Sequence, residues 1–170
     1  MSFYLFSFFG IIFLLFLLSM IWPPDSPWAP WWRTSEEIAR KMCKLAGIKK
    51  GDIVYDLGCG EGVVLMVAAK EFGARGFGVE IDPIRFLYSK WFIKKNGVSS
   101  KVQIKRGNLF DMDFSKANVV IVYLVPKTLN KLLPKFKRLE KGTRIVSYRY
   151  EINLPLSKYD EKSGIRIYTI

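Results

Sequence analysis

Hydrophobic residues follow two different patterns along the chain, and the first is an unbroken apolar run near the N-terminus. The run extends from Phe3 to Trp22 and contains no charged side chain. A helix over these 20 residues would span about 30 Å at about 1.5 Å per residue, which is the thickness of a bilayer core. No basic residue precedes the run and bulky tryptophans follow it, unlike in a cleaved signal peptide. We therefore expect residues 1–24 to form an uncleaved transmembrane anchor.

The basic residues and prolines predict how this anchor would be placed. All 27 lysines and arginines occur at Arg33 or later, so the positive-inside rule puts the rest of the chain on the cytoplasmic side. Residues 25–34 are rich in proline and tryptophan and predict a short, stiff juxtamembrane linker. The predicted localisation is thus a single-pass membrane protein in which residues 35–170 form a domain that faces the cytoplasm.

The second pattern, from Ser35 onward, is an alternation of short apolar runs with helical segments. The runs predict strands at residues 53–57, 76–81, 102–106, 119–124 and 143–150. The segments between them predict helices at residues 35–45, 62–72, 83–95 and 127–139. This order is typical of an α/β fold with a Rossmann-like, largely parallel sheet. Residues 156–159 and 165–170 predict a closing antiparallel hairpin, and the length leaves room for one domain.

A glycine-rich turn follows the first predicted strand and carries the clearest chemistry. Asp56 precedes Gly58, Gly60 and Gly62, and such glycines let a ligand approach the backbone at the start of a helix. Glu80 ends the second predicted strand, where an acidic residue commonly binds ribose hydroxyl groups. Together with Asn108 after the third strand, these residues predict a site for a cofactor that contains a nucleoside.

Spacing and composition decide between the candidate cofactors. A dinucleotide fingerprint needs Gly-x-Gly-x-x-Gly, whereas the third glycine here, Gly62, comes one position early. S-adenosylmethionine fits the motif better. The chain has no histidine, which excludes Ser-His-Asp and Cys-His catalysis. Its two cysteines, Cys43 and Cys59, lack metal-ligand spacing, so we expect no metal site.

Several segments also resemble one methyltransferase family in collinear order. They are residues 30–35, 52–60, 78–81, 95–98, 107–110 and 142–147. The sequence resembles the class I methyltransferases that include the archaeal broad-specificity protein lysine methyltransferase and the mitochondrial enzymes that methylate ATP synthase c-subunit and adenine nucleotide translocase. The resemblance implies S-adenosyl-L-methionine as cofactor and a protein lysine as substrate. It departs at residues 32–35, where the family has Pro-x-Pro-Thr-Pro, and at Val63, where it has arginine.

The motif and the resemblance together predict the residues that contact the cofactor. These are Thr34, Asp56, Gly58, Cys59, Gly60, Glu80, Ile81, Asn108 and Leu109.

The acceptor side of the site is predicted from the needs of methyl transfer. In-line transfer from a sulfonium requires neither a metal nor a covalent intermediate, so positioning does most of the catalysis. An acceptor lysine must first lose its proton, and aromatic surroundings lower its pKa. Trp31, Tyr123 and Tyr148 are our candidates for positioning it. The Asn/Asp-Pro-Pro-Tyr/Phe motif of many nucleic-acid methyltransferases is absent at residues 123–126, which argues against a nucleic-acid substrate.

The net charge of +12 favours anionic partners, acidic lipid headgroups among them. Because a cationic enzyme repels lysine-rich substrates, we expect the substrate to be an isolated lysine on a membrane-associated protein.

Two alternative functions stay open. One is a lipid or small-molecule methyltransferase, and the other is a catalytically silent scaffold that binds S-adenosylmethionine.

Overall fold

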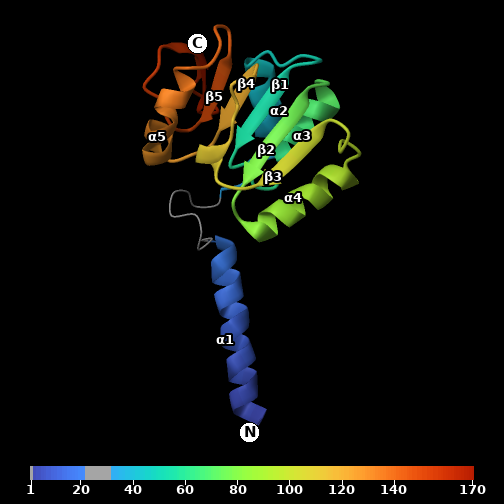
Figure 1. Cartoon of the computed structure of the whole chain (residues 1–170). Coiled ribbons are helices and arrows are strands. Elements are labelled where there is room, and N and C mark those ends of the chain that lie inside the picture. The colour runs from blue at the N-terminus through green and yellow to red at the C-terminus, as the bar shows by residue number, and fades with distance from the viewer. Residues whose placement is uncertain (1, 22–31) are drawn as a thin grey trace.

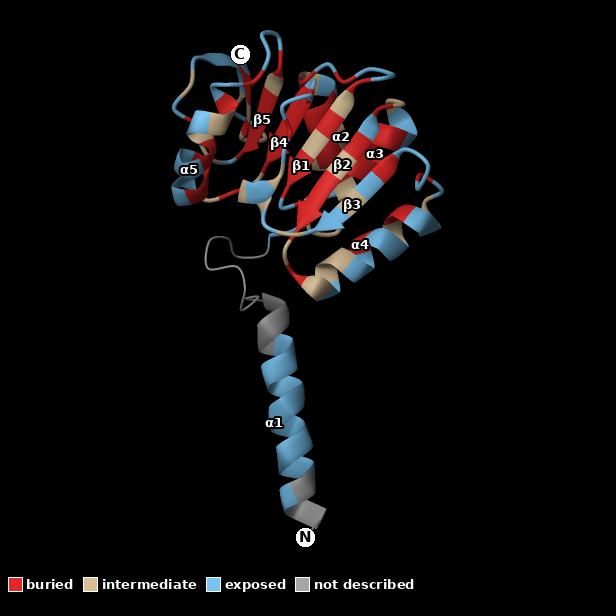
Figure 2. Ribbon diagram, viewed as in Figure 1, coloured by how far each residue is buried: buried red, intermediate tan, exposed pale blue. Residues whose placement is uncertain are grey.

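The chain consists of an N-terminal helix and an α/β body (Figure 1). The computed structural model describes residues 2–21 and 32–170. Helix α1 (Ser2–Ile21) carries exposed apolar side chains along the part for which side chains are described (Figure 2). The predicted linker at residues 25–34 lies mostly outside the described residues, which resume at Trp32.

The predicted transmembrane anchor is wrong. Among the described residues, no helix has both the length and the apolar character needed to cross a membrane. The transmembrane helix in the predicted fold class and the predicted single-pass location facing the cytoplasm are corrected accordingly.

The body is built on a seven-stranded sheet with the order β3-β2-β1-β4-β5-β7-β6. Its strands are β1 (Ile53–Leu57), β2 (Arg75–Glu80), β3 (Val102–Arg106), β4 (Val119–Val122), β5 (Arg144–Tyr148), β6 (Leu156–Asp160) and β7 (Ile165–Thr169). The first five pair in parallel, and β7 runs antiparallel to both β5 and β6. The predicted Rossmann-like, mostly parallel sheet is confirmed, and the closing hairpin forms its β6 edge.

Helices cover both faces of this sheet, with a buried cluster under each layer (Figures 1 and 2). Helices α2 (Glu36–Leu45), α3 (Val63–Glu71) and α4 (Pro83–Lys95) contribute to one cluster, and α5 (Pro126–Phe136) to the other. In α3 every residue from Val64 to Ala69 is buried, so this helix is apolar around most of its circumference. The helix that follows the glycine-rich turn is thereby fixed against β1 and β2.

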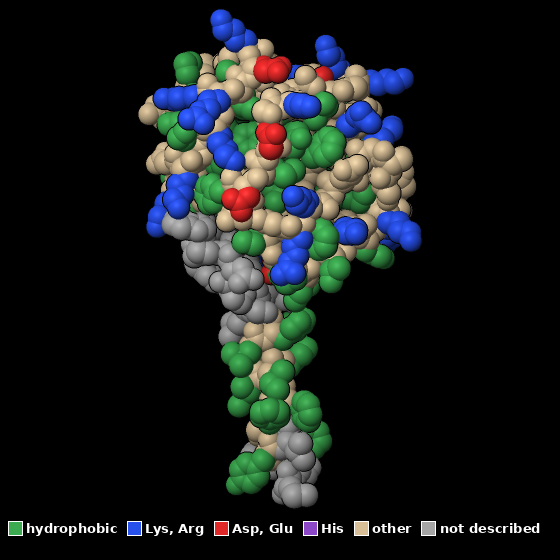
Figure 3. Space-filling model, in the orientation of Figure 1, with side chains coloured by type: hydrophobic (Ala, Val, Ile, Leu, Met, Phe, Trp, Pro, Cys, Tyr) green, Lys and Arg blue, Asp and Glu red, His purple; other side chains and the backbone are tan. Residues whose placement is uncertain are grey.

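Basic side chains outnumber acidic ones on the visible surface of the body (Figure 3). Figure 3 shows lysines and arginines spread over the face in view, with few acidic groups among them, whereas hydrophobic side chains cover the described part of α1. This distribution follows from 27 basic against 15 acidic residues in the chain. The surface therefore attracts anionic groups over a broad area.

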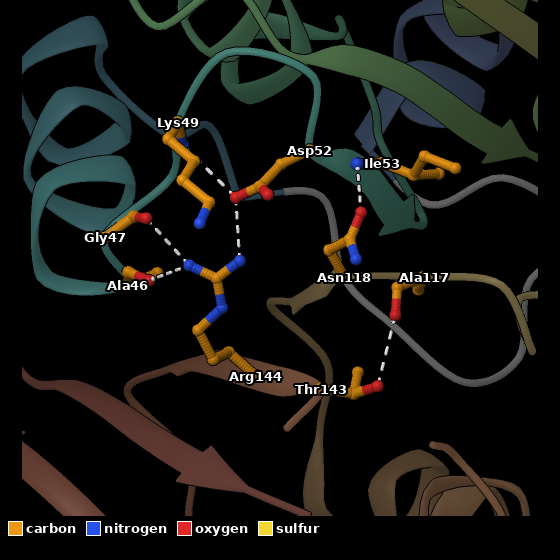
Figure 4. A network of polar contacts seen from close by, with 9 residues as sticks. All are labelled: Ala46, Gly47, Lys49, Asp52, Ile53, Ala117, Asn118, Thr143 and Arg144. Atoms are coloured by element: carbon orange, nitrogen blue, oxygen red, sulfur yellow. Dashed lines mark hydrogen bonds and ion pairs between the residues drawn. The ribbon is translucent and has the colours of Figure 1, made fainter. Parts of the chain in front are cut away.

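Arg144 connects three segments at the amino end of the sheet (Figure 4). Its Nη1 donates to the carbonyl oxygens of Ala46 at 2.6 Å and Gly47 at 2.7 Å, just after α2. Its Nη2 lies 2.7 Å from Oδ2 of Asp52, which precedes β1. The contacts join β5, β1 and the end of α2, away from the carboxyl ends of the strands.

Candidate active site

A pocket lies at the carboxyl ends of the strands, where the strand order reverses between β1 and β4. Open parallel sheets bind ligands at this kind of switch point. All nine residues predicted to contact the cofactor line the pocket: Thr34, Asp56, Gly58, Cys59, Gly60, Glu80, Ile81, Asn108 and Leu109. Their individual contacts with a cofactor stay predictions.

The glycine-rich turn after β1 forms the floor of the pocket and is bound to β2. The backbone N–H groups of Gly58 and Cys59 both donate to the Val79 carbonyl at 3.0 Å. Gly58 has a φ of +81°, and a Cβ atom there would come within 3.3 Å of Leu124. A side chain at this position would be strained and would crowd the pocket wall. Glycine is therefore required for both the turn and the space beside it.

Glu80 at the end of β2 is buried and fixes the other side of this turn. Its Oε2 accepts a hydrogen bond from the Gly60 N–H at 2.8 Å, and its Oε1 accepts one from the Asp82 N–H at 2.9 Å. A carboxylate has about four lone-pair sites, so two remain for further donors. Glu80 thus fits the two hydroxyl groups of a ribose while its orientation is held by backbone amides.

Asp56 is a second buried carboxyl group in the pocket. Burial, and then the nearby charge of Glu80, raise the pKa of Asp56 to about 7. Because a cation beside it would favour the ionised form, Asp56 fits the ammonium group of S-adenosylmethionine. The two acids therefore suit the two polar ends of this cofactor.

The turn after β3 supplies the remaining wall. Asn108 caps the short helix η1 (Leu109–Asp111), since its Oδ1 accepts from the Phe110 N–H at 3.0 Å. This cap holds Leu109 at the pocket. With Ile81 after β2, Leu109 provides apolar surface that suits a flat base such as adenine.

An aromatic cluster of Trp32, Tyr123, Tyr148 and Tyr150 adjoins the pocket. Trp32 stacks on Tyr150 with ring centroids 6.2 Å apart, and Tyr123 meets Tyr148 edge-on at 4.6 Å. Trp32, Tyr123 and Tyr150 line the pocket, whereas Tyr148 lies behind Tyr123 and is 8 % exposed. Burial raises the pKa of Tyr123, so its phenol stays neutral near pH 7.

Residues 56–155 match the family described as the ANTKMT methyltransferase domain. The chain belongs to this family. Its match begins at Asp56 and contains the glycine-rich turn, Glu80, Asn108 and the tyrosines of the aromatic cluster.

Known relatives of this ANTKMT methyltransferase domain include enzymes and a solved structure. A protein-lysine N-methyltransferase of Saccharolobus islandicus is 41% identical over 135 residues, which are 78% of this chain and 82% of the relative. An ATP synthase c-subunit lysine N-methyltransferase of Caenorhabditis elegans is 28% identical over 104 residues, or 61% and 54% of the two chains. The crystal structure of an RNA methyltransferase from Salinibacter ruber with S-adenosyl-L-homocysteine has a TM-score of 0.79 and 34% identity, covering 82% and 94%.

These relatives settle the cofactor and the class of enzyme. The chain is an S-adenosylmethionine-dependent methyltransferase, and S-adenosyl-L-methionine is its cofactor. The methyl group comes from this cofactor when it is bound. We expect it to bind in the pocket at the carboxyl ends of the strands.

Sequence reasoning placed the acceptor candidates only in part. The structure brings Tyr123 and Tyr148 together, but Trp31 lies outside the described residues, and Trp32 occupies the cluster. Trp31 and Trp32 are adjacent in a segment without helical or strand periodicity, so the sequence does not indicate which of them faces the site.

The site roles of two arginines were not predicted from the sequence. Arg33 forms an ion pair at 2.8 Å with Glu61, which joins the segment before α2 to the glycine-rich turn. Ser35 caps α2 by accepting from the Ile38 N–H, and so fixes where this segment begins its helix. The second arginine, Arg149, contacts the aromatic cluster. Arg33 lies in a segment that resembles the family and Arg149 lies in none, so only contacts between distant segments reveal these roles.

Proposed function

We propose that this methyltransferase transfers methyl groups to the side-chain amine of protein lysines. The observation that carries the proposal is the aromatic cluster beside the cofactor pocket. Aromatic faces give a lysine side chain apolar walls, and an amine among them is partly desolvated. The lysine specificity of the Saccharolobus relative supports the same substrate class.

The residues of the acceptor side favour the reactive form of a lysine. Leu124 and Val125 continue the apolar wall after β4. A desolvated ammonium loses its proton more readily than one in water, and the freed lone pair can then attack a methyl carbon in line with its leaving sulfur. In this proposal the proton of the ammonium group passes to solvent water.

The proposed substrate is an isolated lysine with acidic or neutral neighbours. The basic surface in Figure 3 repels lysine-rich segments and attracts acidic ones. A membrane-associated protein as substrate is part of the proposal. Its support is the Caenorhabditis relative, which is named for the c-subunit of ATP synthase.

RNA is the second candidate substrate, because the Salinibacter structure is described as an RNA methyltransferase. The segment after β4 argues against it. A side-chain amide or carboxylate that could accept hydrogen bonds from the exocyclic amine of a base is absent from this segment, which consists of Tyr123, Leu124, Val125 and Pro126.

The test is to incubate the full chain with methyl-labelled S-adenosylmethionine and, separately, with extracted proteins, RNA and lipids. We expect label in protein, located on lysine side chains by mass spectrometry. Tyr123→Ala should reduce turnover more than it weakens cofactor binding, whereas the exposed Tyr159→Ala serves as a matched control with normal turnover. Label found only in RNA or lipid would overturn the lysine proposal.

A further inference from the structure

Arg149 places a positive charge against the aromatic cluster. Its guanidinium carbon lies 5.4 Å from the ring centroid of Tyr148, 5.8 Å from that of Trp32 and 6.0 Å from that of Tyr123. A side-chain hydrogen bond with Tyr148 further raises the pKa of Arg149. Two of these three rings, Trp32 and Tyr123, also line the pocket. Arg149 and the pocket are therefore in contact with the same two aromatic rings.

The backbone of Arg149 is held in an unusual conformation to achieve this. Its φ of +66° makes it the one non-glycine residue with positive φ in the described part of the chain. Long side chains rarely adopt this region, and they stay there only where the surroundings enforce it. Here the Arg149 N–H donates to the Gly164 carbonyl at 2.8 Å, and its own carbonyl accepts from Arg166 Nη1 at 2.9 Å. The β6–β7 hairpin thus fixes the residue.

The aromatic cluster acts on a lysine in two opposite ways, because burial among the rings favours the neutral amine whereas the ring faces attract the ammonium form. The cation–ring attraction stabilises an ammonium group, which has no lone pair to attack the methyl carbon. A second cation near the same rings opposes this preference through charge repulsion.

We propose that Arg149 is a positioning residue that favours the neutral, reactive form of the acceptor amine by holding a fixed positive charge at the aromatic cluster. This inference rests on the proposed function, since it concerns the amine of a lysine substrate. An amine against the ring face of Trp32 or Tyr123 that is turned away from the guanidinium would lie roughly 10 Å from it, because cation–ring contacts place each charge within about 6 Å of the ring centroid. Because Arg149 is exposed, an effective dielectric constant of about 40–80 applies, and the protonated form is then disfavoured about 2- to 4-fold.

The other charged and titratable groups around the site do not replace this effect. The groups that face Arg149 and the pocket are Arg33, Asp56, Glu61, Glu80, Arg85, Tyr123, Tyr148, Tyr150 and Arg166. Burial raises the pKa of Tyr123, so its phenol is neutral near pH 7. Glu61 is paired with Arg33, and Glu80 is held by two backbone amides on the cofactor side. Asp56 also lies in the cofactor part, whereas the guanidinium carbon of Arg149 lies within 6.0 Å of three ring centroids of the cluster.

The first experiment measures binding without catalysis. The probes are n-butylammonium, which imitates the protonated lysine side chain at pH 7, and neutral 1-butanol of similar size. Both are titrated by NMR, at low ionic strength, into the full chain saturated with S-adenosylhomocysteine, which lacks the positive sulfonium. We expect Arg149→Gln to bind n-butylammonium about 2- to 4-fold more tightly than the wild type, with unchanged 1-butanol affinity. Arg149→Lys, which keeps the charge, should resemble the wild type.

The contrary outcomes are distinct. Equal tightening for both probes would mean that Arg149 merely fills space, and unchanged affinity for both would mean that its charge is not felt. Either result overturns the inference, as does a wild type that binds neither probe. Because Gln is strained at positive φ, Arg149→Asn provides a second neutral variant whose side chain tolerates this conformation.

The second experiment uses catalysis and separates this inference from the proposed function. With a single-lysine peptide, the rise of kcat/KM with pH should move upward by about 0.3–0.6 pH units in Arg149→Gln and stay in place in Arg149→Lys. An equal displacement in both variants would overturn the role of the charge. If no lysine is methylated at all, the proposed function fails, while the binding of the two probes still decides whether Arg149 disfavours a cation.

Discussion

Glu80 connects the cofactor pocket to the backbone that shapes it. Its two oxygens accept from Gly60 and Asp82, and they also face the predicted ribose position. Glu80→Ala should weaken S-adenosylmethionine binding about 5- to 150-fold, the effect of losing two hydrogen bonds. Calorimetry measures this affinity, and Glu71→Ala on the exposed side of α3 is the matched control. Unchanged affinity in a folded Glu80→Ala protein would contradict the ribose assignment.

Asp56 should make cofactor binding depend on pH. Its pKa is raised to about 7 by burial and by Glu80, so the carboxyl group is partly protonated at neutral pH. A cationic cofactor favours the ionised form, and binding must then release a proton below this pKa. Affinity should therefore rise as pH increases through about 7 and become constant above it.

Calorimetry at several pH values, in buffers of different ionisation enthalpy, measures both the affinity and the released proton. Asp56→Asn cannot ionise and should lose this dependence. A wild-type affinity that is constant between pH 6 and 8 would show that Asp56 does not meet the cationic group.

Arg144 carries a stability prediction at the scale of whole elements. Arg144→Ala would leave Asp52 and the carbonyls of Ala46 and Gly47 without their donors. We expect the free energy of unfolding to fall by about 2–4 kcal/mol, somewhat below the value for fully buried pairs because the Arg144 side chain is 22% exposed. Arg144→Lys should lose less, since a lysine keeps the charge but not the fork of donors.

Urea unfolding measures these differences. Arg40→Ala is the matched control, because its ion pair with Glu71 is exposed and should contribute little. Equal destabilisation by Arg144→Ala and Arg40→Ala would contradict the structural role of this network.

The order of elements could be predicted because each apolar run has the length of a buried strand. The boundaries could not, and the strand predicted to continue to Tyr150 ends at Tyr148 because Arg149 turns to positive φ. In the pocket, the positions around the glycine motif could be predicted because they lie in a run of consecutive residues that forms a recognisable motif. The positions of Trp32 and Arg149 could not be predicted, since they depend on contacts with distant residues: Trp32 packs on Tyr123 and Tyr150, and the β6–β7 hairpin fixes Arg149.

At the scale of the whole molecule, the charge of +12 should select substrates. A peptide with one lysine between acidic residues should have a KM roughly tenfold lower than the same peptide with basic flanks. This difference in KM should become smaller at 0.5 M salt, because the Debye length falls to a few ångströms at that ionic strength. Methylation kinetics at two salt concentrations measure it. A preference for basic flanks, or one that salt leaves unchanged, would contradict selection by surface charge.

The Arg33–Glu61 ion pair has a consequence for the timing of turnover. It joins the segment that holds Trp32 and Thr34 to the glycine-rich turn, so both sides of the pocket rim are connected through it. Spent cofactor must leave between reaction cycles, and the rim must open for that exchange. Arg33→Ala should therefore shorten the residence time of S-adenosylhomocysteine, which stopped-flow displacement measures. Arg33→Lys should retain an intermediate rate. A dissociation rate that neither substitution changes would mean that the cofactor leaves by another route.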